Sequence, residues 1–302
     1  MNWFKEREAE FVALGGQLLW DEPLSKHTYY RIGGPARLLA IPRGEACLDW
    51  LARGLRETGA PRWILGLGSN ALVADEGLPG VVIKTSRISI DIAYADGIVR
   101  AGAGVAISSL LRKAAQEGWG GLEFLTGVPG SVGGAVFMNA GTHLGESGAR
   151  LDWVRAFELG SGSAHVYMGD ELRFEYRRNL FLSESSIVTA AAFRVDAREP
   201  VAVKRAIDET LARRKATQPI DYPSCGSVFK NPPGHHAWQV VDKVGLRGHR
   251  IGDAQFAEKH SNFIINLGHA RAADVRALIE LAKSRAQSEL GVRLEEEVKY
   301  FR

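Results

Sequence analysis

The sequence predicts an α+β protein that is built from three consecutive units. Amphipathic helical periods and short apolar runs typical of strands follow one another along the whole chain. The composition also shifts at Arg198-Glu199-Pro200, which indicates a boundary there. The chain has 302 residues, and domains commonly hold about 100 to 150, so several units are expected. We place them at residues 1–85, 86–198 and 199–302.

The first unit is predicted to combine two helices with short strands. Residues 3–14 have helical spacing that ends at Gly15-Gly16, and residues 44–58 carry their apolar side chains on one helical face. Short apolar runs in this unit indicate strands at residues 36–41, 62–66, 71–74 and 80–84.

The second unit is predicted to hold strands around one central helix. Residues 106–117 place apolar side chains at i, i+3, i+4 and i+7, and the pattern stops at Gly118, which is a typical helix end. Apolar runs on either side of this helix indicate strands near residues 88–94, 97–102, 151–158, 164–168 and 186–195.

The third unit is predicted to alternate helices and strands. It opens with a basic helix over residues 202–216 and contains a long helix over residues 272–289 with one apolar face. Between and after these helices we expect a short strand at 227–229, a helix around 236–244, a strand at Phe263–Ile265 and a last strand at 292–298.

Composition and charge exclude several classes of protein. Lys and Arg number 38 against 35 Asp and Glu, and the net charge of +3 is spread along the chain, unlike the basic stripe of a dedicated nucleic-acid binder. A hydrophobic content of 45% with 24% charged residues is that of a globular protein rather than a disordered one. Because no 18 consecutive residues are apolar and the first residues lack the apolar core of a signal peptide, we expect no membrane association.

Cysteine usage points to a reducing compartment. Cys47 and Cys225 are the two cysteines of the chain, which is large enough to fold without a disulfide, so the cytoplasm is the expected location. The sequence has no Cys-x-x-Cys pair, His-Glu-x-x-His motif or cluster of His and Cys. We therefore expect no metal site.

Glycine is concentrated in one region of the chain, because 17 of the 34 glycines lie between Gly66 and Gly148. Glycine is favoured where the backbone needs a positive φ or approaches something closely. In the first of two notable stretches, an apolar run enters the loop Gly66-Leu67-Gly68-Ser69-Asn70. In the second, the turn Pro129-Gly130 leads to Ser131, which is suited to cap a short helix of small residues.

The N–H groups of these turns and the open end of that short helix are typical of an anion site. A single Gly-x-Gly loop is more often only a turn. Neither stretch is a Walker loop, because no Gly-Lys-Ser/Thr follows, and neither opens a regular amphipathic helix as a Rossmann fingerprint does. Two such loops in one region raise the chance of a phosphate site, so a cofactor with a diphosphate, held by an unusual fold, and plain turns stand as equal alternatives.

The third unit contains a second cluster of reactive groups. Ser227, Lys230 and Asn231 place a hydroxyl, an ammonium and an amide around one tight turn, although Gly-Ser in a loop is more often structural. Cys225 precedes this turn and could be read as a nucleophile. No arrangement of His and Asn supports that interpretation, so we expect Cys225 to be a buried small residue.

Two further charged groups have alternative interpretations. Arg177 and Arg178 lie among aromatic residues, where a guanidinium either faces solvent and pairs with a carboxylate or clamps the carboxylate of a substrate. Glu297 lies in the predicted last strand on the face opposite to Leu294 and Val298. Because the apolar face is normally buried, Glu297 would face either solvent or a cleft.

Taken in order along the chain, these residues resemble the UDP-N-acetylenolpyruvoylglucosamine reductase family. Any one of the similar stretches is weak evidence, but the ordered set covers most of the chain and is highly specific. These stretches are Thr28 to Pro35, Gly66 to Asn70, Gly127 to Ala135, Tyr176-Arg177, Gly226 to Pro232, His260 to Phe263 and Leu294 to Val298.

The resemblance implies a fold and two cofactors. It implies a non-covalent FAD held by two N-terminal subdomains of the vanillyl-alcohol-oxidase (PCMH) type, followed by a C-terminal α/β domain that binds the substrate. It also implies NADPH as the source of hydride and UDP-N-acetylglucosamine enolpyruvate as the UDP-sugar substrate, which use one cleft in turn. The product is UDP-N-acetylmuramate, a precursor of peptidoglycan.

The resemblance also implies catalytic roles. Hydride addition to the enolpyruvyl group leaves negative charge on the carbon that bears the carboxylate, which calls for positive charge and hydrogen-bond donors. By the resemblance, Arg177 and Glu297 stabilise this charge, and a protonated Glu297 with a raised pKa would donate a hydrogen bond. Ser227 matches the proton donor that quenches the carbanion.

Binding roles follow from the same match, and no residue matches a metal ligand. Three residues match positions that meet the UDP-sugar or the nicotinamide nucleotide, namely Lys230, Asn231 and His260. Residues that match the FAD-contacting loops are Gly66, Leu67, Gly68, Ser69, Asn70, Gly127, Pro129, Gly130, Ser131, Gly133, Gly134 and Asn139.

The chain also departs from the family pattern. Its length is that of the shorter subclass, which lacks an insertion and the tyrosine that the insertion supplies. Asn179 stands where serine is usual, and Cys225 where a smaller residue is common. Many relatives continue past the position of Arg302, so we expect Glu297 to lie near a terminus that frays.

We expect an NADPH-dependent, FAD-containing reductase in the bacterial cytoplasm, with a monomer favoured. One alternative is an oxidase of the same FAD-binding fold that acts on another small molecule, which would not need Arg177, Ser227 and Lys230. The other is a nucleotide-binding module without redox chemistry, which would purify without the colour of a flavin.

Overall fold

The computed structural model describes residues 1–302, and its contacts group the chain into two compact units. Unit 1 comprises Met1–Trp20, Leu38–Leu67 and Pro79–Ala212. Unit 2 comprises Asp21–Arg37, Gly68–Leu78 and Arg213–Arg302. Two N-terminal segments thus belong with the C-terminal part, because Tyr30, Ile32 and Leu72 are buried in its core. The division into three units at residues 85 and 198 stays a prediction.

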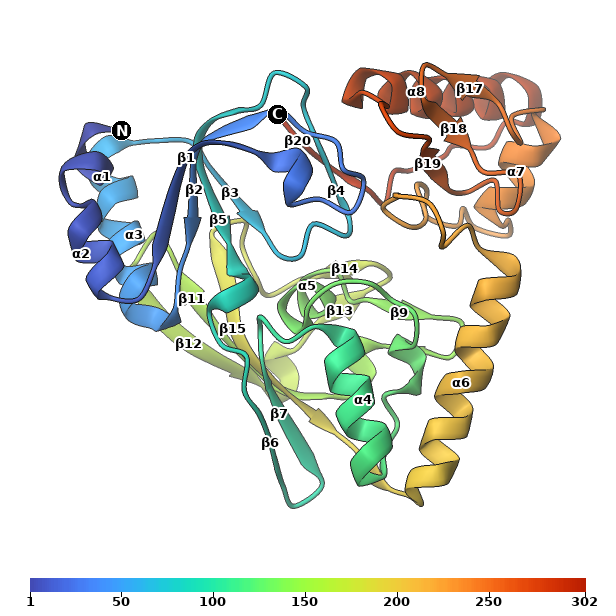
Figure 1. The fold of residues 1–302 in the computed structure, drawn as a ribbon. Coiled ribbons are helices and arrows are strands. Elements are labelled where there is room, and N and C mark those ends of the chain that lie inside the picture. Colours follow the sequence, from blue (N-terminus) through green and yellow to red (C-terminus); the bar gives the residue numbers. More distant parts are fainter. The chain divides into compact units, whose positions relative to one another are not determined.

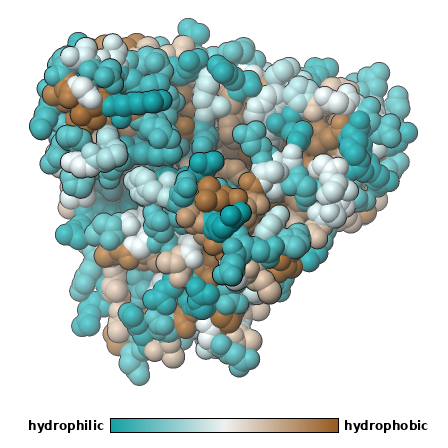
Figure 2. Space-filling view, turned by 180° about the vertical axis from the view of Figure 1, so that it is seen from behind, coloured by the Kyte–Doolittle hydropathy of each residue, from teal (hydrophilic) through white to brown (hydrophobic).

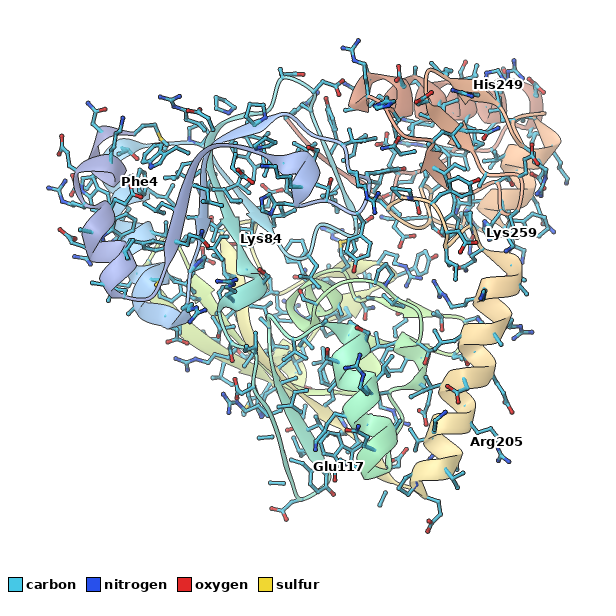
Figure 3. The ribbon with its side chains drawn as sticks, in the orientation of Figure 1. Phe4, Lys84, Glu117, Arg205, His249 and Lys259 are labelled. Carbon is cyan, nitrogen blue, oxygen red and sulfur yellow. The ribbon has the colours of Figure 1, made fainter.

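One part of unit 1 packs helices on a four-stranded sheet in which the strand order is β1-β2-β5-β3 and β3 is parallel to β5. Phe4 and Trp50 of the helices share a buried cluster with Val81 of the sheet. Figure 1 shows the helices beside β1 and β2, and Figure 3 labels Phe4 among them. The elements are α1 (Asn2–Glu6), α2 (Glu8–Ala13), α3 (Gly44–Thr58), β1 (Gln17–Pro23), β2 (Pro35–Ile41), β3 (Arg62–Leu65) and β5 (Leu78–Lys84).

Two expectations for this region need correction. The helix predicted over residues 3–14 is two short helices, because Arg7 has φ −114° and ψ 17°, which is not a helical conformation. Strand β1 was not predicted, since its burial does not alternate and so leaves no period-2 pattern in the sequence. The helix over residues 44–58 is confirmed as α3.

The other part of unit 1 is a five-stranded antiparallel sheet with the order β12-β11-β15-β7-β6. Every residue of β15 except the last is buried, because Ile187 belongs to the cluster around Phe4 while Val188 and Ala191 belong to a second core with α4 and α5. The elements are β6 (Ile92–Ala95), β7 (Ile98–Gly102), α4 (Ile107–Glu117), α5 (Val132–Phe137), β11 (Leu151–Glu158), β12 (Ser163–Met168) and β15 (Ser186–Arg194).

Three pairs of two-residue strands add hairpins and a short contact that the sequence did not indicate. They are β8 with β16, β9 with β10, and β13 with β14. Their bounds are β8 (Trp119–Gly120), β9 (Gly141–Thr142), β10 (Gly145–Glu146), β13 (Phe174–Glu175), β14 (Arg178–Asn179) and β16 (Asp196–Ala197). Helix α6 (Pro200–Thr217) then leads toward unit 2 along the chain.

Unit 2 packs two helices on a three-stranded antiparallel sheet with the order β17-β18-β19. Val240 of α7 and Val275 and Leu278 of α8 lie in its core, with Phe256 of the sheet. A further pair of strands, β4 and β20, runs parallel. The bounds are β4 (Ala71–Val73), α7 (Ala237–Lys243), β17 (Arg250–Ile251), β18 (Ala254–Phe256), β19 (Ile264–Asn266), α8 (Ala272–Leu290) and β20 (Lys299–Phe301).

The C-terminal end of unit 2 differs from expectation. Residues 227–229 form only isolated bridges, from Ser227 to Phe263 and from Phe229 to Glu296, instead of a strand. The predicted strand at 292–298 lies later in the chain, as β20, which pairs with β4. The chain end is therefore held in a ladder rather than fraying, and the Ala74 N–H donates to the Phe301 carbonyl at 2.9 Å.

The N-terminus of helix α8 is capped by the carboxylate of Asp75, a residue almost two hundred positions earlier in the chain. Asp75 accepts hydrogen bonds from the N–H groups of Ala272 at 2.8 Å and Ala273 at 3.0 Å. These N–H groups have no partner inside the helix, and a carboxylate near the positive end of the helix dipole adds to the stabilisation. Asp75 therefore ties the loop after β4 to the longest helix of unit 2.

The helices show no membrane-spanning segment, because none is both long enough and apolar enough to cross a bilayer. Figure 2 shows one face of the molecule on which hydrophilic residues predominate and apolar residues form smaller areas. Scattered apolar residues of this kind are normal on the surface of a globular protein.

Replacing Asp75 by Ala should lower the free energy of unfolding by about 1–2 kcal/mol, because two helix-terminal N–H groups lose their acceptor. Urea unfolding followed by circular dichroism measures this. The Asp75→Asn variant keeps one acceptor oxygen and should lose less. An unchanged midpoint for Asp75→Ala would show that water replaces the carboxylate without cost.

Candidate functional site

The two glycine-rich stretches come together in unit 1. A Cβ atom built on Gly66 would lie 3.3 Å from the Ser131 Oγ, so the loop after β3 runs beside the start of α5. The first loop is divided between the units, because Gly66 and Leu67 belong to unit 1 while Gly68, Ser69 and Asn70 belong to unit 2. In unit 1, two glycine-containing segments that are distant in the sequence therefore lie side by side.

The individual glycines are present for different reasons. Gly127 and Gly130 have φ values of +71° and +126°, a region that residues with side chains rarely adopt. Gly68 is required by packing, because a Cβ there would clash with the His27 main chain. Gly133 is tightly packed, and its Cβ would lie 3.0 Å from that of Ala103.

Gly134 is different, because within unit 1 a Cβ on it would meet only the Ser131 Oγ, at an ordinary distance of 3.7 Å. Its backbone conformation also does not require glycine. A glycine that neither conformation nor packing requires leaves a flat stretch of main chain. Such a stretch is suited to contact with a flat ligand. The glycine loops of unit 1 therefore fit a large planar cofactor such as FAD.

The start of α5 is a correction to the sequence analysis. Ser131 caps the helix as expected, since its Oγ accepts from the Gly134 N–H at 3.4 Å. However, the next two N–H groups are also paired, from Val132 to the Val105 carbonyl and from Gly133 to the Ala103 carbonyl, each at 2.9 Å. The helix end is thus closed by the loop after β7 and is not an open anion site.

Asn139 has its side chain fully engaged inside unit 1. Its Nδ2 donates to the Glu146 Oε2 and to the Glu175 carbonyl, both at 2.9 Å, and its Oδ1 accepts from the Gly148 N–H at 2.9 Å. Asn139 is buried and has a φ of +44°. Any contact of Asn139 with FAD would therefore come from its main chain.

Arg177 lies at the turn between β13 and β14, with a φ of +57° that is unfavourable for a residue with a side chain. Its Nη2 donates to the Gly141 carbonyl at 2.9 Å, and its Nη1 lies 3.4 Å from the Glu146 Oε1. The guanidinium also lies 4.8 Å from the centre of the Tyr176 ring. With its side chain only 14% exposed, Arg177 does not face bulk solvent.

Asn179 follows Arg177 at the place where serine was expected from the family pattern. Its Nδ2 donates to the Phe137 carbonyl at 2.7 Å, and its Oδ1 accepts from the Leu182 N–H at 2.9 Å. The first contact joins the segment after Arg177 to the end of α5, and the second fixes the chain three residues further on. The departure from the pattern is therefore accommodated by main-chain contacts.

Unit 2 brings together Ser227 and Glu297. The Glu297 N–H donates to the carbonyl of Val228, the residue after Ser227, at 2.7 Å. The Glu297 carbonyl accepts from the Asn70 Nδ2 at 3.0 Å. Glu297 is half-buried, and its orientation toward solvent or toward a cleft stays a prediction.

Sequence reasoning missed Asn262 as a member of this arrangement. It is buried, and its side chain makes two hydrogen bonds with the main chain of Phe229, accepting from the N–H at 3.0 Å and donating to the carbonyl at 2.8 Å. The Asn262 carbonyl also accepts from the Val228 N–H at 2.8 Å. The buried amide in His-Ser-Asn-Phe was the available signal.

Lys230 and Asn231 continue the same loop. The Lys230 ammonium forms an ion pair with Glu295, and the Lys230 N–H donates to the Glu295 carbonyl at 2.9 Å. The Asn231 Oδ1 accepts from the N–H of Ala237, the first residue of α7, at 3.0 Å. Asn231 thus caps the start of α7. The same contact fixes the direction in which its Nδ2 points.

His260 lies in unit 2 against Phe263, with ring centres 4.9 Å apart. Burial lowers the pKa of its imidazole, and the nearby Arg247 and Arg214 lower that pKa further, whereas Asp242 acts in the opposite direction. His260 is therefore neutral near pH 7. It can offer a hydrogen bond to a phosphate but not a positive charge.

Cys225 is buried, as expected, and its Sγ donates to the Ala71 carbonyl at 3.3 Å. Burial raises the pKa of this thiol well above its ordinary value, so Cys225 stays protonated and unreactive at neutral pH. The nucleophile interpretation of Cys225 has no support in its surroundings.

Comparison with known proteins relates both parts of the chain to described families. Residues 36–166 match a family model described as an FAD binding domain. Residues 218–301 match the model described as the C-terminal domain of UDP-N-acetylenolpyruvoylglucosamine reductase. The two matches confirm the predicted fold class, an FAD-binding region followed by a C-terminal domain.

Full-length relatives carry the same description. A UDP-N-acetylenolpyruvoylglucosamine reductase of Heliobacterium modesticaldum is 44% identical over 94% of this chain and 90% of its own length. A second one, from Symbiobacterium thermophilum, is 40% identical over 100% of this chain and 97% of its own. The crystal structure of the reductase from Thermus caldophilus covers 95% of this chain and 99% of its own, with 38% identity and a TM-score of 0.78.

The neutral state of His260 predicts a dependence of stability on pH. The unfolded chain has a histidine pKa near 6.5 and the folded protein a lower one, so stability is fully present above pH 6.5 and falls as the pH drops below it. Urea unfolding at about pH 5 and pH 7.5 should show a smaller decrease for His260→Asn than for the parent protein. His235→Asn, at an exposed histidine, is the control, and an equal decrease for both variants would contradict the prediction.

Proposed function

The chain belongs to the UDP-N-acetylenolpyruvoylglucosamine reductase family, and we propose that Arg177, Ser227 and Glu297 carry the chemistry of its reaction. The enzyme reduces UDP-N-acetylglucosamine enolpyruvate to UDP-N-acetylmuramate with NADPH and FAD, in peptidoglycan precursor synthesis. Family membership over the full length decides against the two alternatives, another FAD-dependent oxidase and a non-catalytic nucleotide module.

Hydride transfer from NADPH to the enolpyruvyl group of the UDP-sugar is the chemistry that a bound FAD would supply. The space beside Gly134 and the contact between Gly66 and Ser131 support a flavin seat in these loops. The residues proposed to hold FAD are Gly66, Leu67, Gly68, Ser69, Asn70, Gly127, Pro129, Gly130, Ser131, Gly133 and Gly134, with Asn139 acting through its main chain.

Arg177 is proposed to stabilise the negative charge that develops on the substrate. A guanidinium with two fixed contacts, to Gly141 and Glu146, is oriented before the substrate arrives. Donors that need no reorganisation stabilise a developing charge far better than mobile ones. Glu297 is proposed to assist as a second group beside the substrate carboxylate, held in place by Val228 and Asn70.

Ser227 is proposed to donate the proton that completes the reduction. Its Oγ–H bond breaks as the new C–H bond forms on the carbon that carries the negative charge, and the serine regains a proton from solvent. A hydroxyl is a weak acid, but a carbanion is a strong base, so a donor at short distance suffices. Support comes from the bridge with Phe263 and the bond between Val228 and Glu297, which hold the loop on both sides of Ser227.

Lys230, Asn231 and His260 are proposed to contact the nucleotide parts of the UDP-sugar or NADPH. The Lys230 ammonium is half of an ion pair with Glu295, so a phosphate would compete with that exposed carboxylate. His260, being neutral, would donate a hydrogen bond only. We further propose that the enzyme works as a monomer in the cytoplasm, which fits the absence of membrane-spanning helices.

Replacing Gly134 by Ala tests the flavin seat. The apoprotein should keep or slightly raise its melting temperature, since Ala is the better helix residue and the site has room for a methyl group. Affinity for FAD, measured by quenching of flavin fluorescence, should fall about tenfold or more, which corresponds to roughly 1.4 kcal/mol of steric conflict. Gly160→Ala at an exposed turn is the control, and an FAD affinity equal to that of the parent protein would place the flavin elsewhere.

Replacing Ser227 by Ala tests the proton donor. Flavin bleaching by NADPH, followed in a stopped-flow instrument, should stay within about twofold of the parent rate. Return of the flavin colour on addition of the UDP-sugar should slow by about 10²- to 10⁴-fold, the usual contribution of a positioned acid. If both half-reactions slowed equally, Ser227 would be a structural residue instead.

A further inference from the structure

The surroundings of Arg177 in unit 1 hold a carboxylate that none of the proposed roles uses. Glu146 ends strand β10, and its side chain is 34% exposed. Its Oε1 lies 3.4 Å from the Arg177 Nη1, and its Oε2 accepts from the Asn139 Nδ2 at 2.9 Å. Two donors thus converge on the two oxygens of one side chain.

Only a carboxylate satisfies this geometry. A carboxylate has acceptors on both oxygens, whereas a primary amide has one acceptor and one donor group. In Glu146→Gln, the amide nitrogen would face either the Arg177 guanidinium or the Asn139 amide, and a donor would then oppose a donor. The requirement for two acceptors explains why an anion stands beside a guanidinium that is proposed to serve an anionic substrate.

Glu146 is itself held by the fold. In the β9–β10 hairpin it is paired with Gly141, whose carbonyl is the second partner of Arg177. The contacts of the guanidinium with Gly141 and Glu146 therefore lie on one hairpin. Asn139 joins this hairpin to the other one, because the same Nδ2 that contacts Glu146 also donates to the Glu175 carbonyl of β13.

The backbone at these positions is strained. Arg177 and Asn139 are two of the five residues other than glycine with a positive φ, at +57° and +44°. Each such conformation costs on the order of 1 kcal/mol and persists only where neighbouring contacts determine it. Here Asn139 holds Glu146, and the contacts with Glu146 and Gly141 orient the Arg177 side chain.

We propose that Glu146, held by Asn139, is the positioning residue for Arg177 and sets the direction of its guanidinium. This inference rests on the proposed role of Arg177 in stabilising charge on the substrate. Glu146 need not touch the substrate, because its effect is transmitted through the Arg177 Nη1. A displacement of about 1 Å in such a group costs up to about 100-fold in rate.

The test measures each half-reaction separately in a stopped-flow instrument. Glu146→Ala should slow reoxidation of the flavin by the UDP-sugar by about 10- to 100-fold, the size of loss that a misplacement of up to about 1 Å produces. Flavin bleaching by NADPH should stay within about twofold, and the affinity for the product, measured by calorimetry, should change by less than about threefold. Glu146→Gln should show the same pattern with a smaller loss, because one of its two contacts can still form.

A double-mutant cycle separates positioning from a merely structural role. In an Arg177→Ala background, Glu146→Ala should have no further effect on reoxidation, because the residue that it positions is gone. Additive losses from the two substitutions would overturn the inference. Glu175→Gln is the matched control, since this carboxylate lies two residues before Arg177, is 58% exposed and pairs with Arg178 instead, so its rates should stay within about twofold.

Failure of the inference and failure of the proposed function give different results. If Arg177→Ala leaves reoxidation unchanged, the role of Arg177 itself is wrong. If Arg177→Ala slows reoxidation while Glu146→Ala does not, only the positioning role falls. A lowered melting temperature for Glu146→Ala with equal slowing of both half-reactions would mark Glu146 as structural.

Discussion

The hydrogen bond from the Glu297 N–H to the Val228 carbonyl is the contact on which the arrangement in unit 2 depends. It joins the loop that carries Ser227 to the C-terminal segment. The Asn70 side chain connects the loop after β3 to the same segment, because its Nδ2 donates to the Glu297 carbonyl. The Lys299 N–H in turn donates to the Asn70 carbonyl. Main-chain contacts of this kind set positions without depending on side-chain rotamers, so Ser227 and Glu297 are held near each other by backbone geometry.

Buried asparagines organise both units in the same way. Asn139 joins two hairpins, Asn262 holds the main chain of Phe229, and Asn266 donates to the Tyr30 carbonyl while accepting from Gly268 and Ala270. Each amide both donates and accepts, so it can satisfy irregular backbone where no ladder forms. Removing one leaves buried main-chain groups unpaired, which costs about 1–3 kcal/mol for each group.

Long periodic elements and ordered motifs were predictable from the sequence. Helices α3, α4 and α8 lie within one or two residues of their expected bounds because their amphipathic periods end at glycine. The segment at 227–229 and the last strand were not predictable, because the Phe229 main chain pairs with the Asn262 side chain and β20 pairs with β4, partners that are distant in sequence. For the same reason the capping of α8 by Asp75 leaves no local signal.

The sequence predicted which residues are candidates for the site, but it did not predict the contacts that hold them. Motif order identified Arg177, Ser227 and Glu297, yet it said nothing of Glu146 or Asn262, whose importance lies in what they hold. It also placed Asn139 in an FAD-contacting loop without indicating that its amide is engaged within unit 1. A side chain that orients another residue is invisible to sequence patterns unless the residue that it orients is already placed.

The pairing of Arg177 with Glu146 raises the question of why a guanidinium that is proposed to stabilise charge should be partly neutralised. The carboxylate weakens the attraction of Arg177 for any distant anion, and water and salt screen that attraction in any case. What the reaction requires is stabilisation of charge at one carbon at one moment, and this depends on fixed donors at short range rather than on net charge. A guanidinium is one rigid plane of N–H donors, so its contacts with Glu146 and Gly141 fix the direction of the whole group. Orientation is gained at the expense of long-range attraction, and at contact distance orientation is the larger effect.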